Sequence, residues 1–202
     1  LKSVPVIDWV IHLAGAPIAD KRWSNAVREE LRSSRIFSTE LLVATLREMN
    51  VSPKVFICAS AIGIYGERQD EKLTELSSIG RGFLADLTSD WEAMASKSSV
   101  ERVIHARFGI VLSPNGGALG KMLLPFRLGV GGRLGDGRHY MSWITLSDAV
   151  SALIFILKNP IVRGPVNIVS PSPIRNEEFT QILGKVLGRP TLFPVPTFAL
   201  RL

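Results

Sequence analysis

Two hydroxyl side chains follow a short apolar run in the first half of the chain. The run, residues 55–59, has the length and composition of a buried strand, and Ser60 and Tyr65 come after it. Small and hydroxyl-bearing residues at the carboxyl end of a buried strand are typical of the edge where a parallel sheet meets its ligand. A serine hydroxyl and a phenol at that edge could bind a substrate oxygen or exchange a proton with it.

Two further apolar runs end on residues that could take part in binding. Residues 9–13 lead into Ala14 and Gly15, which are small enough for a planar cofactor to approach the backbone. Residues 103–108 carry Arg107 near their end. A buried arginine needs a partner, so Arg107 is either paired with a carboxylate or directed at an anion in the cleft.

Other kinds of site find no support in the sequence. The three histidines are far apart and lack the close spacing of metal ligands, so we expect no metal. The residues around Ser60 do not form the Gly-x-Ser-x-Gly turn of a serine hydrolase. The single cysteine, Cys58, lies within a predicted strand, where a buried and inert thiol is expected.

Strands alternate with helices over the first half of the chain. Apolar residues recur at helical spacing over 25–49, a strand follows at 55–59, a helix is predicted over 83–96, and a strand over 103–108. This alternation predicts an α/β fold: a doubly wound, Rossmann-like parallel sheet with right-handed crossovers. No strand, glycine-rich turn and helix precede residue 9, so we expect the N-terminal strands of such a fold to lie outside these 202 residues.

The predicted elements become shorter after residue 112. Short helices are predicted over 122–128, 146–157 and 176–187, and short strands over 139–144 and 165–169. We therefore divide the chain into a partial Rossmann-like domain, 1–112, which the resemblance described below makes NAD(P)-binding, and a mixed substrate lobe, 113–202, some of whose elements return to the main sheet.

The composition limits the classes of partner. A hydrophobic content of 46% and a charged content of 21% are ordinary for a globular protein, and no apolar stretch approaches the ~18 residues of a membrane span. The net charge is +6, but the basic residues are scattered without aromatic platforms, which argues against nucleic acid and favours an anionic small molecule. The single cysteine and the absence of a visible signal peptide favour a reducing compartment, which is the cytoplasm or an organelle stroma or matrix.

Several strings along nearly the whole chain resemble one family, the extended and atypical short-chain dehydrogenase/reductases. The resemblance is to its epimerase-like branch, often labelled nucleoside-diphosphate-sugar epimerase or cell division inhibitor. The matching residues are 11–15, 18–23, 34–36, 60–66, 90–92, 107–112, 124–127 and 142–144. Each string is short, so the resemblance depends on their order and spacing. It implies that the glycine-rich first third of the nucleotide-binding domain and a C-terminal piece lie outside these residues.

The resemblance implies an NAD(P) cofactor and gives five residues a role. Leu13, Ala14 and Gly15 would pass beside the adenosine half of the cofactor. Ser60 would lie against the cofactor and hydrogen-bond a substrate carbonyl or alcohol. Tyr65 would be a wall of the site or its proton donor. The choice between NADP and NAD stays open.

Two arginines would also contact the cofactor, each with an alternative. Arg35 stands where the wider superfamily commonly has an asparagine, and it would bind a phosphate or carboxylate or else be a solvated helix charge. Arg107 would bind the cofactor unless a carboxylate takes it. One departure is important: the family's Tyr-x-x-x-Lys pair is absent, and the corresponding positions hold Leu84 and Thr88.

The family resemblance, taken together with the absence of the Tyr-x-x-x-Lys pair, leaves two candidate functions. The first is an NAD(P)-binding epimerase or oxidoreductase that acts on a nucleotide-sugar or another polar small molecule, with Ser60 and Tyr65 as its catalytic hydroxyls. The alternative is a non-catalytic dinucleotide-binding or interaction protein linked to cell division. The resemblance also allows for a homodimer, in which helices of the two subunits would pack against each other. Whether the chain turns over a substrate is left open.

Overall fold

The computed structural model describes residues 6–195, which divide into two compact units. The first unit comprises the described residues up to Phe108 together with Leu153–Asn167. The second comprises Gly109–Ala152 and the described residues from Ile168 onward. None of the helices in this segment of the chain is both long enough and apolar enough to cross a membrane.

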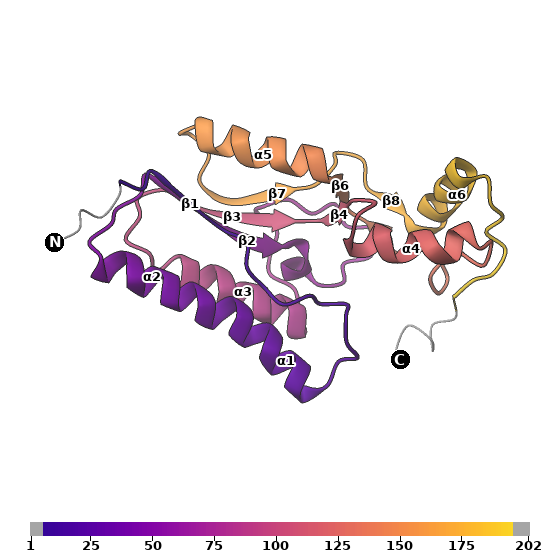
Figure 1. Ribbon diagram of the computed structural model, residues 1–202, viewed down its shortest axis with the longest axis horizontal. Coiled ribbons are helices and arrows are strands. Elements are labelled where there is room, and N and C mark those ends of the chain that lie inside the picture. The colour runs from indigo at the N-terminus through magenta and orange to yellow at the C-terminus, as the bar shows by residue number, and fades with distance from the viewer. Residues whose placement is uncertain (1–5, 196–202) are drawn as a thin grey trace. The chain divides into compact units, whose positions relative to one another are not determined.

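A four-stranded sheet forms the core of the first unit (Figure 1). Its strands are β1 (Trp9–His12), β2 (Val55–Ala61), β3 (Val103–Phe108) and β7 (Gly164–Ile168), in the order β1-β2-β3-β7. β1 is parallel to β2, and β2 is parallel to β3. The predicted α/β fold with a parallel sheet is therefore confirmed.

Helices lie on both faces of this sheet. α1 (Asn25–Arg32), α2 (Ser38–Glu48) and α3 (Phe83–Ala95) lie on one face in Figure 1. The last turns of α5 (Leu146–Lys158), which belong to the first unit from Leu153 onward, lie on the other face. A short 3-10 helix, Ile62–Tyr65, follows β2 directly and brings Tyr65 into the core.

A π-helical turn, Ser33–Phe37, joins α1 to α2, whereas the sequence predicts an uninterrupted helix. A π turn loosens the regular hydrogen-bond ladder, and side chains bind the carbonyls at this place. Ser38 Oγ donates to the carbonyl of Ser34 at 2.7 Å, and Thr39 Oγ1 donates to the carbonyl of Arg35 at 2.6 Å. The turn places Arg35 on the buried face of the helical run.

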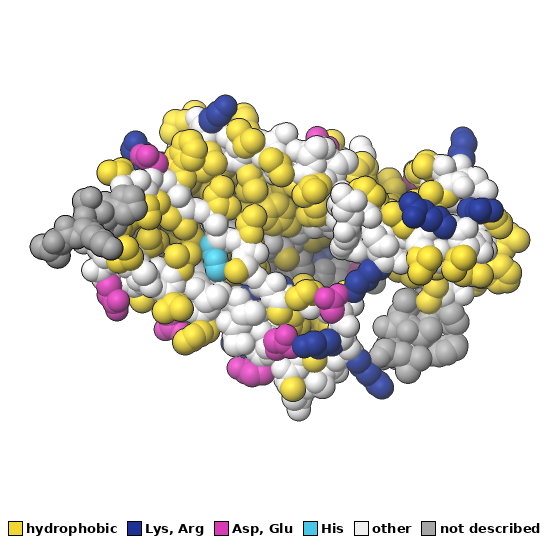
Figure 2. Space-filling model, in the orientation of Figure 1, with side chains coloured by type: hydrophobic (Ala, Val, Ile, Leu, Met, Phe, Trp, Pro, Cys, Tyr) yellow, Lys and Arg dark blue, Asp and Glu magenta, His cyan; other side chains and the backbone are white. Residues whose placement is uncertain are grey.

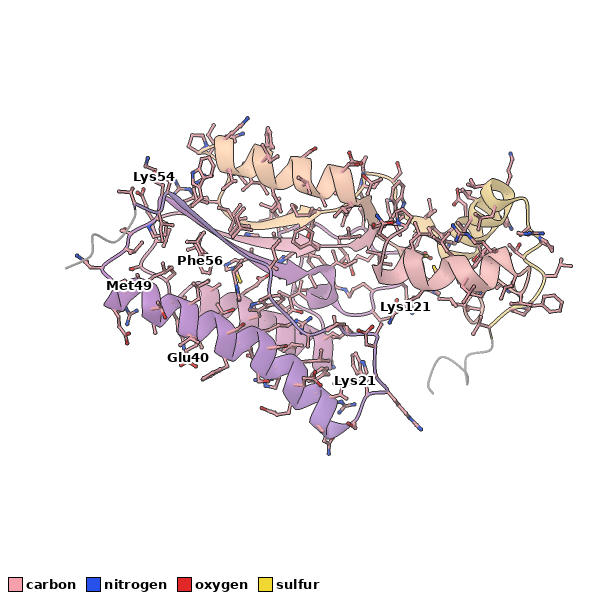
Figure 3. The ribbon with its side chains drawn as sticks, in the orientation of Figure 1. Lys21, Glu40, Met49, Lys54, Phe56 and Lys121 are labelled. Carbon is pink, nitrogen blue, oxygen red and sulfur yellow. The ribbon has the colours of Figure 1, made fainter. Side chains whose placement is uncertain are left out.

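An apolar cluster packs α2 and α3 against the sheet. Its members include Val43 of α2, Phe56 and Cys58 of β2, and Trp91 and Ala95 of α3. Phe56 is wholly buried and lies between β2 and α2 in Figure 3. Because Trp91 and Ala95 are one helical turn apart, this cluster fixes which face of α3 is turned toward the sheet.

A buried arginine caps the end of α5. The Arg102 side chain donates to the carbonyls of Ile156, Leu157, Asn159 and Val162 at 2.7–3.2 Å. The last carbonyls of a helix have no partner within the helix and carry its negative dipole end, so a cation there both pairs and stabilises them. Arg102 therefore ties the start of β3 to the end of α5.

Strand β1 is the edge of the sheet and exposes large apolar side chains. Trp9, Ile11 and Leu13 are each more than two fifths exposed. Figure 2 shows hydrophobic side chains gathered on the face where β1 lies. An open edge with apolar side chains is a surface that natural sheets ordinarily cover or charge.

The second unit contains short elements. β4 (Ile110–Leu112) is parallel to β6 (Trp143–Thr145), β5 (Tyr140–Met141) is antiparallel to β8 (Ile174–Arg175), and the helices are α4 (Gly117–Arg127), the first turns of α5 and α6 (Asn176–Leu187). The sequence predicts one strand over 139–144, but the structure has two, which pair with different partners. Asn176 is fully buried, and its Oδ1 accepts a hydrogen bond from the backbone N–H of Leu134 at 2.7 Å.

Candidate active site

Side chains from β2, β3 and α3 meet on one face of the sheet. Ser60 of β2 lies opposite Arg107 of β3 in the strand register. Both side chains point to the face covered by α3, because alternate strand residues share a face and Cys58 packs against Trp91 of α3. Glu92, next to Trp91, completes the group from the helix.

Glu92 is the centre of a buried hydrogen-bond network. Its carboxylate accepts two hydrogen bonds from the Arg107 guanidinium, Nε to Oε1 at 2.8 Å and Nη2 to Oε2 at 2.9 Å. Oε1 also accepts the Ser60 hydroxyl at 2.5 Å. The Arg107 and Glu92 side chains are only 8% and 12% exposed, so this two-point pairing is largely shielded from water.

The network continues from Arg107 to residues that are distant in sequence. Arg107 Nη1 donates to the Tyr65 hydroxyl at 3.0 Å, and the Tyr65 hydroxyl donates to Asn167 Oδ1 at 2.6 Å. The backbone N–H of Asn167 donates to Glu75 Oε1 at 2.8 Å. One chain of hydrogen bonds therefore joins Ser60 to β7 and to the loop that carries Glu75.

Burial and charge act on Glu92 in opposite directions. Burial alone would raise its pKa, but the hydrogen bonds from Arg107 and Ser60 and the Arg107 charge prevail, and the pKa of Glu92 is lowered. The Glu92 carboxylate in turn raises the pKa of Arg107. Both groups are therefore charged at neutral pH, and the Glu92 carboxylate can only accept hydrogen bonds.

A buried histidine lies beside this network. His105 Nε2 lies 3.1 Å from the Ser96 hydroxyl, and His105 Nδ1 is buried without a hydrogen-bond partner among the described residues. Burial lowers the pKa of His105, although the nearby Glu92 charge opposes this effect. The imidazole is therefore neutral at neutral pH and adds no charge to the Arg107–Glu92 pair.

A second cluster holds the turn that follows β1. The backbone N–H of Ala16 donates to Ser34 Oγ, and the carbonyl of Ala16 accepts a hydrogen bond from Arg35 Nη2, both at 3.0 Å. The Arg35 guanidinium stacks 5.3 Å from the centre of the Trp91 ring. A Cβ at Gly15 would come within 3.1 Å of this guanidinium. A side chain at position 15 would therefore press on the Arg35 guanidinium, which would have to shift by a few tenths of an ångström.

The structure corrects one interpretation of Arg35 and decides between two for Arg107. Arg35 is 8% exposed, so the alternative of a solvated helix charge is wrong. The partners that the structure describes for its guanidinium are carbonyls and the Ser34 hydroxyl. Arg107 is paired with a carboxylate, which is the first of the two alternatives for a buried arginine. Cofactor contacts by Arg35 and Arg107 stay predictions.

The predicted site residues fall into two groups. Ser60, Tyr65 and Arg107 belong to one network, whereas Leu13, Ala14 and Gly15 lie exposed after β1 and Arg35 lies beside them. The residues that sequence reasoning missed are Glu92, Asn167, Glu75 and His105. The requirement that a buried Arg107 have an acidic partner is the signal that could have found Glu92, a carboxylate next to the buried Trp91 on α3. No sequence signal pointed to Asn167.

The positions of the absent Tyr-x-x-x-Lys pair carry no acid or base. Leu84 lies on α3 against Gly63, and Thr88 Oγ1 is bonded to the carbonyl of Leu84 at 2.7 Å. Glu92 is the next residue on this helix face, one turn after Thr88. The ionisable group of this face is therefore one turn further along α3 than the lysine position.

Gly80 fixes the close approach of the loop after Tyr65. A Cβ at Gly80 would collide with the backbone carbonyl of Tyr65, so Gly80→Ala must displace the loop and weaken the position of the phenol. We expect a loss of about 1–3 kcal/mol in the free energy of unfolding, measured by urea denaturation. Gly120→Ala, a helical position with its nearest neighbouring atom at 3.7 Å, is the control and should be neutral or stabilising. Equal behaviour of the two variants would contradict the steric argument.

Cys58 is expected to be chemically silent in the folded protein. The residue is 1% exposed, and burial raises the pKa of its thiol to about 12, so only ~1 thiol in 10,000 is ionised at pH 8. The buried thiol predicted from the sequence is confirmed. Ellman's reagent should modify Cys58 only after denaturation, and rapid modification of the native protein would show that β2 opens locally.

In this parallel sheet, small residues follow β1 and two hydroxyl side chains lie at or just after the carboxyl end of β2. This arrangement is typical of nucleotide-binding α/β proteins. The model of the NAD dependent epimerase/dehydratase family matches residues 1–168, and the chain belongs to this family. The predicted epimerase-like short-chain dehydrogenase/reductase resemblance is confirmed.

Named relatives agree with this assignment. An epimerase family protein of Mycobacterium bovis is 46% identical over 197 residues, which are 96% of this chain and 65% of that protein. The crystal structure of human epimerase family protein SDR39U1 with NADPH is 33% identical with a TM-score of 0.93, covering 99% of this chain and 69% of that chain. The nucleoside-diphosphate sugar epimerase from Corynebacterium glutamicum is 34% identical with a TM-score of 0.74, covering 95% and 41%. The chain thus spans about two thirds of the first two proteins.

Proposed function

We propose that this chain binds NADP(H) and takes part in hydride transfer to or from a polar small molecule. The similarity to the human protein that was crystallised with NADPH is the observation that carries the proposal. The similarity to the C. glutamicum nucleoside-diphosphate sugar epimerase favours a nucleotide-sugar as the substrate class. When bound, the nicotinamide supplies the hydride acceptor or donor.

The residues after β1 fit the adenosine side of such a cofactor. Leu13, Ala14 and Gly15 are exposed at the end of the edge strand, and positions 14 and 15 present little more than backbone. Arg35 lies directly beside Gly15 and brings a positive charge to this turn, which would favour a phosphate-bearing ligand. These four residues would hold the cofactor from this side.

Residues at the carboxyl end of β2 and directly after it would act on the substrate. Ser60 is the group we place against a substrate oxygen, next to the cofactor. Tyr65 would form a wall of the site, because its hydroxyl already donates to Asn167 and accepts from Arg107. In this proposal Arg107 acts through Glu92 and Tyr65, and its own contact with the cofactor stays a prediction.

A non-catalytic role in dinucleotide binding or protein interaction is the second candidate. It is favoured by Leu84 and Thr88, which stand where the family's tyrosine and lysine are expected. The cytoplasmic or organellar location, the homodimer, and the division into a cofactor-binding domain over residues 1–112 and a substrate lobe over residues 113–202 also stay predictions.

Titration of the full chain with NADPH and NADH, followed by nucleotide fluorescence and thermal shift, tests the proposal. We expect micromolar binding of NADPH and weaker binding of NADH. Arg35→Gln should weaken NADPH binding by about tenfold, since one charge-assisted contact is worth about 1.5 kcal/mol or more. Arg32→Gln, an exposed arginine on the same helical run, is the control. A folded protein that binds neither nucleotide would refute the proposal.

A further inference from the structure

We propose that Ser60 and Glu92 form a proton-transfer pair that takes the place of the absent Tyr-x-x-x-Lys. The inference rests on the proposed function, because it concerns the substrate proton that accompanies hydride transfer. It assigns a reaction role to Glu92, a residue that the sequence alone did not single out.

The direction of one hydrogen bond carries the inference. The ionised Glu92 carboxylate has no proton to give, so the hydrogen in the 2.5 Å contact belongs to Ser60 Oγ. Ser60 therefore presents only lone pairs to a substrate. A hydroxyl in this state accepts a hydrogen bond from an alcohol, and it can take up the alcohol proton because its own proton has an acceptor already in contact.

Arg107 holds the acceptor in place. Its two hydrogen bonds fix both carboxylate oxygens of Glu92, and its charge keeps the carboxylate ionised in the resting state. The Arg107–Glu92 pair is largely buried, so few alternative arrangements are open to the carboxylate. Arg107 is thus a positioning residue for Glu92.

Tyr65 is less suited to carry the proton. Its hydroxyl donates to Asn167 Oδ1 at 2.6 Å and accepts from Arg107 Nη1 at 3.0 Å, so both of its main hydrogen-bonding directions are occupied. Proton donation by Tyr65 would require one of these bonds to break. Ser60, which is only 3% exposed, donates its hydroxyl to Glu92, and this bond need not break for Ser60 Oγ to accept a substrate alcohol.

The proposed step balances in both directions. In oxidation of a substrate alcohol, the C–H bond breaks and its electron pair leaves as hydride to the nicotinamide. The alcohol O–H bond breaks, its proton bonds to Ser60 Oγ, the Ser60 proton passes to Glu92 Oε1, and a carbonyl forms. Reduction reverses these transfers, with Glu92 returning the proton through Ser60.

A carboxyl titration tests the pair without any substrate. The ¹³C NMR signal of the Glu92 carboxyl carbon is followed between pH 2 and 7. This signal is assigned by its absence from the spectrum of Glu92→Gln. The charged and titratable groups around it are Arg107 and His105. Ser60→Ala should shift the titration of Glu92 to higher pH, because the ionised form loses a hydrogen bond. Ser33→Ala, an exposed serine whose hydroxyl donates to the carbonyl of Glu30, is the control and should leave the Glu92 titration in place. An unchanged titration in Ser60→Ala would overturn the inference.

Kinetics with a panel of nucleoside-diphosphate sugars and NADP(H) provide the second test. Ser60→Ala and Glu92→Gln should each lower kcat about 100-fold, and the double variant should lose no more than either single variant, because the two groups act as one unit. NADPH affinity should fall far less than kcat in all three, and it should stay unchanged in Glu92→Gln. Variants are compared below their melting temperatures, so that loss of folded protein does not contribute. Additive losses would identify Glu92 as a structural residue only and overturn the pair.

Measurements on the wild-type protein distinguish a failure of the proposed function from a failure of the Ser60–Glu92 pair. A folded protein that binds no nucleotide refutes the proposed function and the pair together. A protein that binds NADPH but turns over no member of the panel overturns the pair together with the hydride-transfer part of the proposed function, and leaves a dinucleotide-binding protein. Turnover with the expected non-additivity supports both.

Discussion

Replacing Glu92 with alanine is expected to lower the free energy of unfolding by about 3–5 kcal/mol, because it leaves the buried Arg107 guanidinium without its partner. A charge that loses its counter-charge in a shielded site must be rehydrated or remain unpaired, and both cost stability. The loss should be read from urea denaturation followed by circular dichroism.

An exposed pair on the same helix gives a matched control. Asp90 of α3 pairs with Arg32 at 2.7 Å, but their side chains are 49% and 41% exposed. Water and salt screen such a pair, so Asp90→Ala should cost less than about 1 kcal/mol. Similar losses in Glu92→Ala and Asp90→Ala would mean that burial of the Arg107–Glu92 pair adds nothing.

The contribution of Glu92 to the free energy of unfolding should also depend on pH. The pKa of Glu92 is lowered in the folded chain, so the unfolded chain binds the proton more readily and acid favours unfolding. The advantage of wild type over Glu92→Gln should be fully present well above pH 4.5, the ordinary value for glutamate, and should shrink as the pH falls through the lower folded-state pKa. His12, whose pKa burial lowers, adds a shared loss below pH 6.5 in both proteins. The Glu92 charge opposes the lowering of the His105 pKa, so the loss from His105 should be larger in Glu92→Gln than in wild type.

Replacing Arg102 with alanine is the second change with a large expected effect, a loss of about 3 kcal/mol. The guanidinium satisfies two carbonyls in the last turn of α5, those of Ile156 and Leu157, and two in the segment that follows the helix. A hydrogen bond from a charged donor is worth more than a neutral one. Water can reach some of these carbonyls once the side chain is removed, so the losses are not additive. Hydrogen exchange should accelerate most in the last turn of α5.

A lysine at the same position separates charge from geometry. Arg102→Lys keeps the positive charge at the helix end but offers a single ammonium in place of the planar guanidinium, so it cannot reach all four carbonyls. We expect a loss between those of wild type and alanine. Full stability of the lysine variant would show that the helix dipole, rather than the four hydrogen bonds, provides the stabilisation.

Local periodicity was sufficient to predict the elements around the candidate site. β3 begins and ends at the predicted residues, and α3 differs by one residue at its end. The burial of Cys58 and the need of Arg107 for a partner also followed from the sequence. These features depend on the side chains of one segment and on the face that the segment buries, and that information is local.

The tertiary structure decided which groups meet. Ser60 and Glu92 are 32 residues apart, and Tyr65 and Asn167 are 102 apart. The spacing of residues within a segment carries no record of such pairs, because they form only when strand register and helix packing bring the segments together. The same holds for Arg35, whose position on the buried face depends on a π-helical turn stabilised by the Ser38 and Thr39 side chains.

The sequence by itself determined the α/β class, the order of the strands along the chain and the presence of two hydroxyls near the carboxyl end of β2, although β2 runs to Ala61 and includes Ser60, which was predicted to follow it. The tertiary structure determined that the Ser60 hydroxyl points to Glu92, and that Arg107 holds Glu92. The reason is physical: apolar periodicity fixes which face of an element is buried, whereas the partner of a buried charge is chosen by the other elements packed against that face.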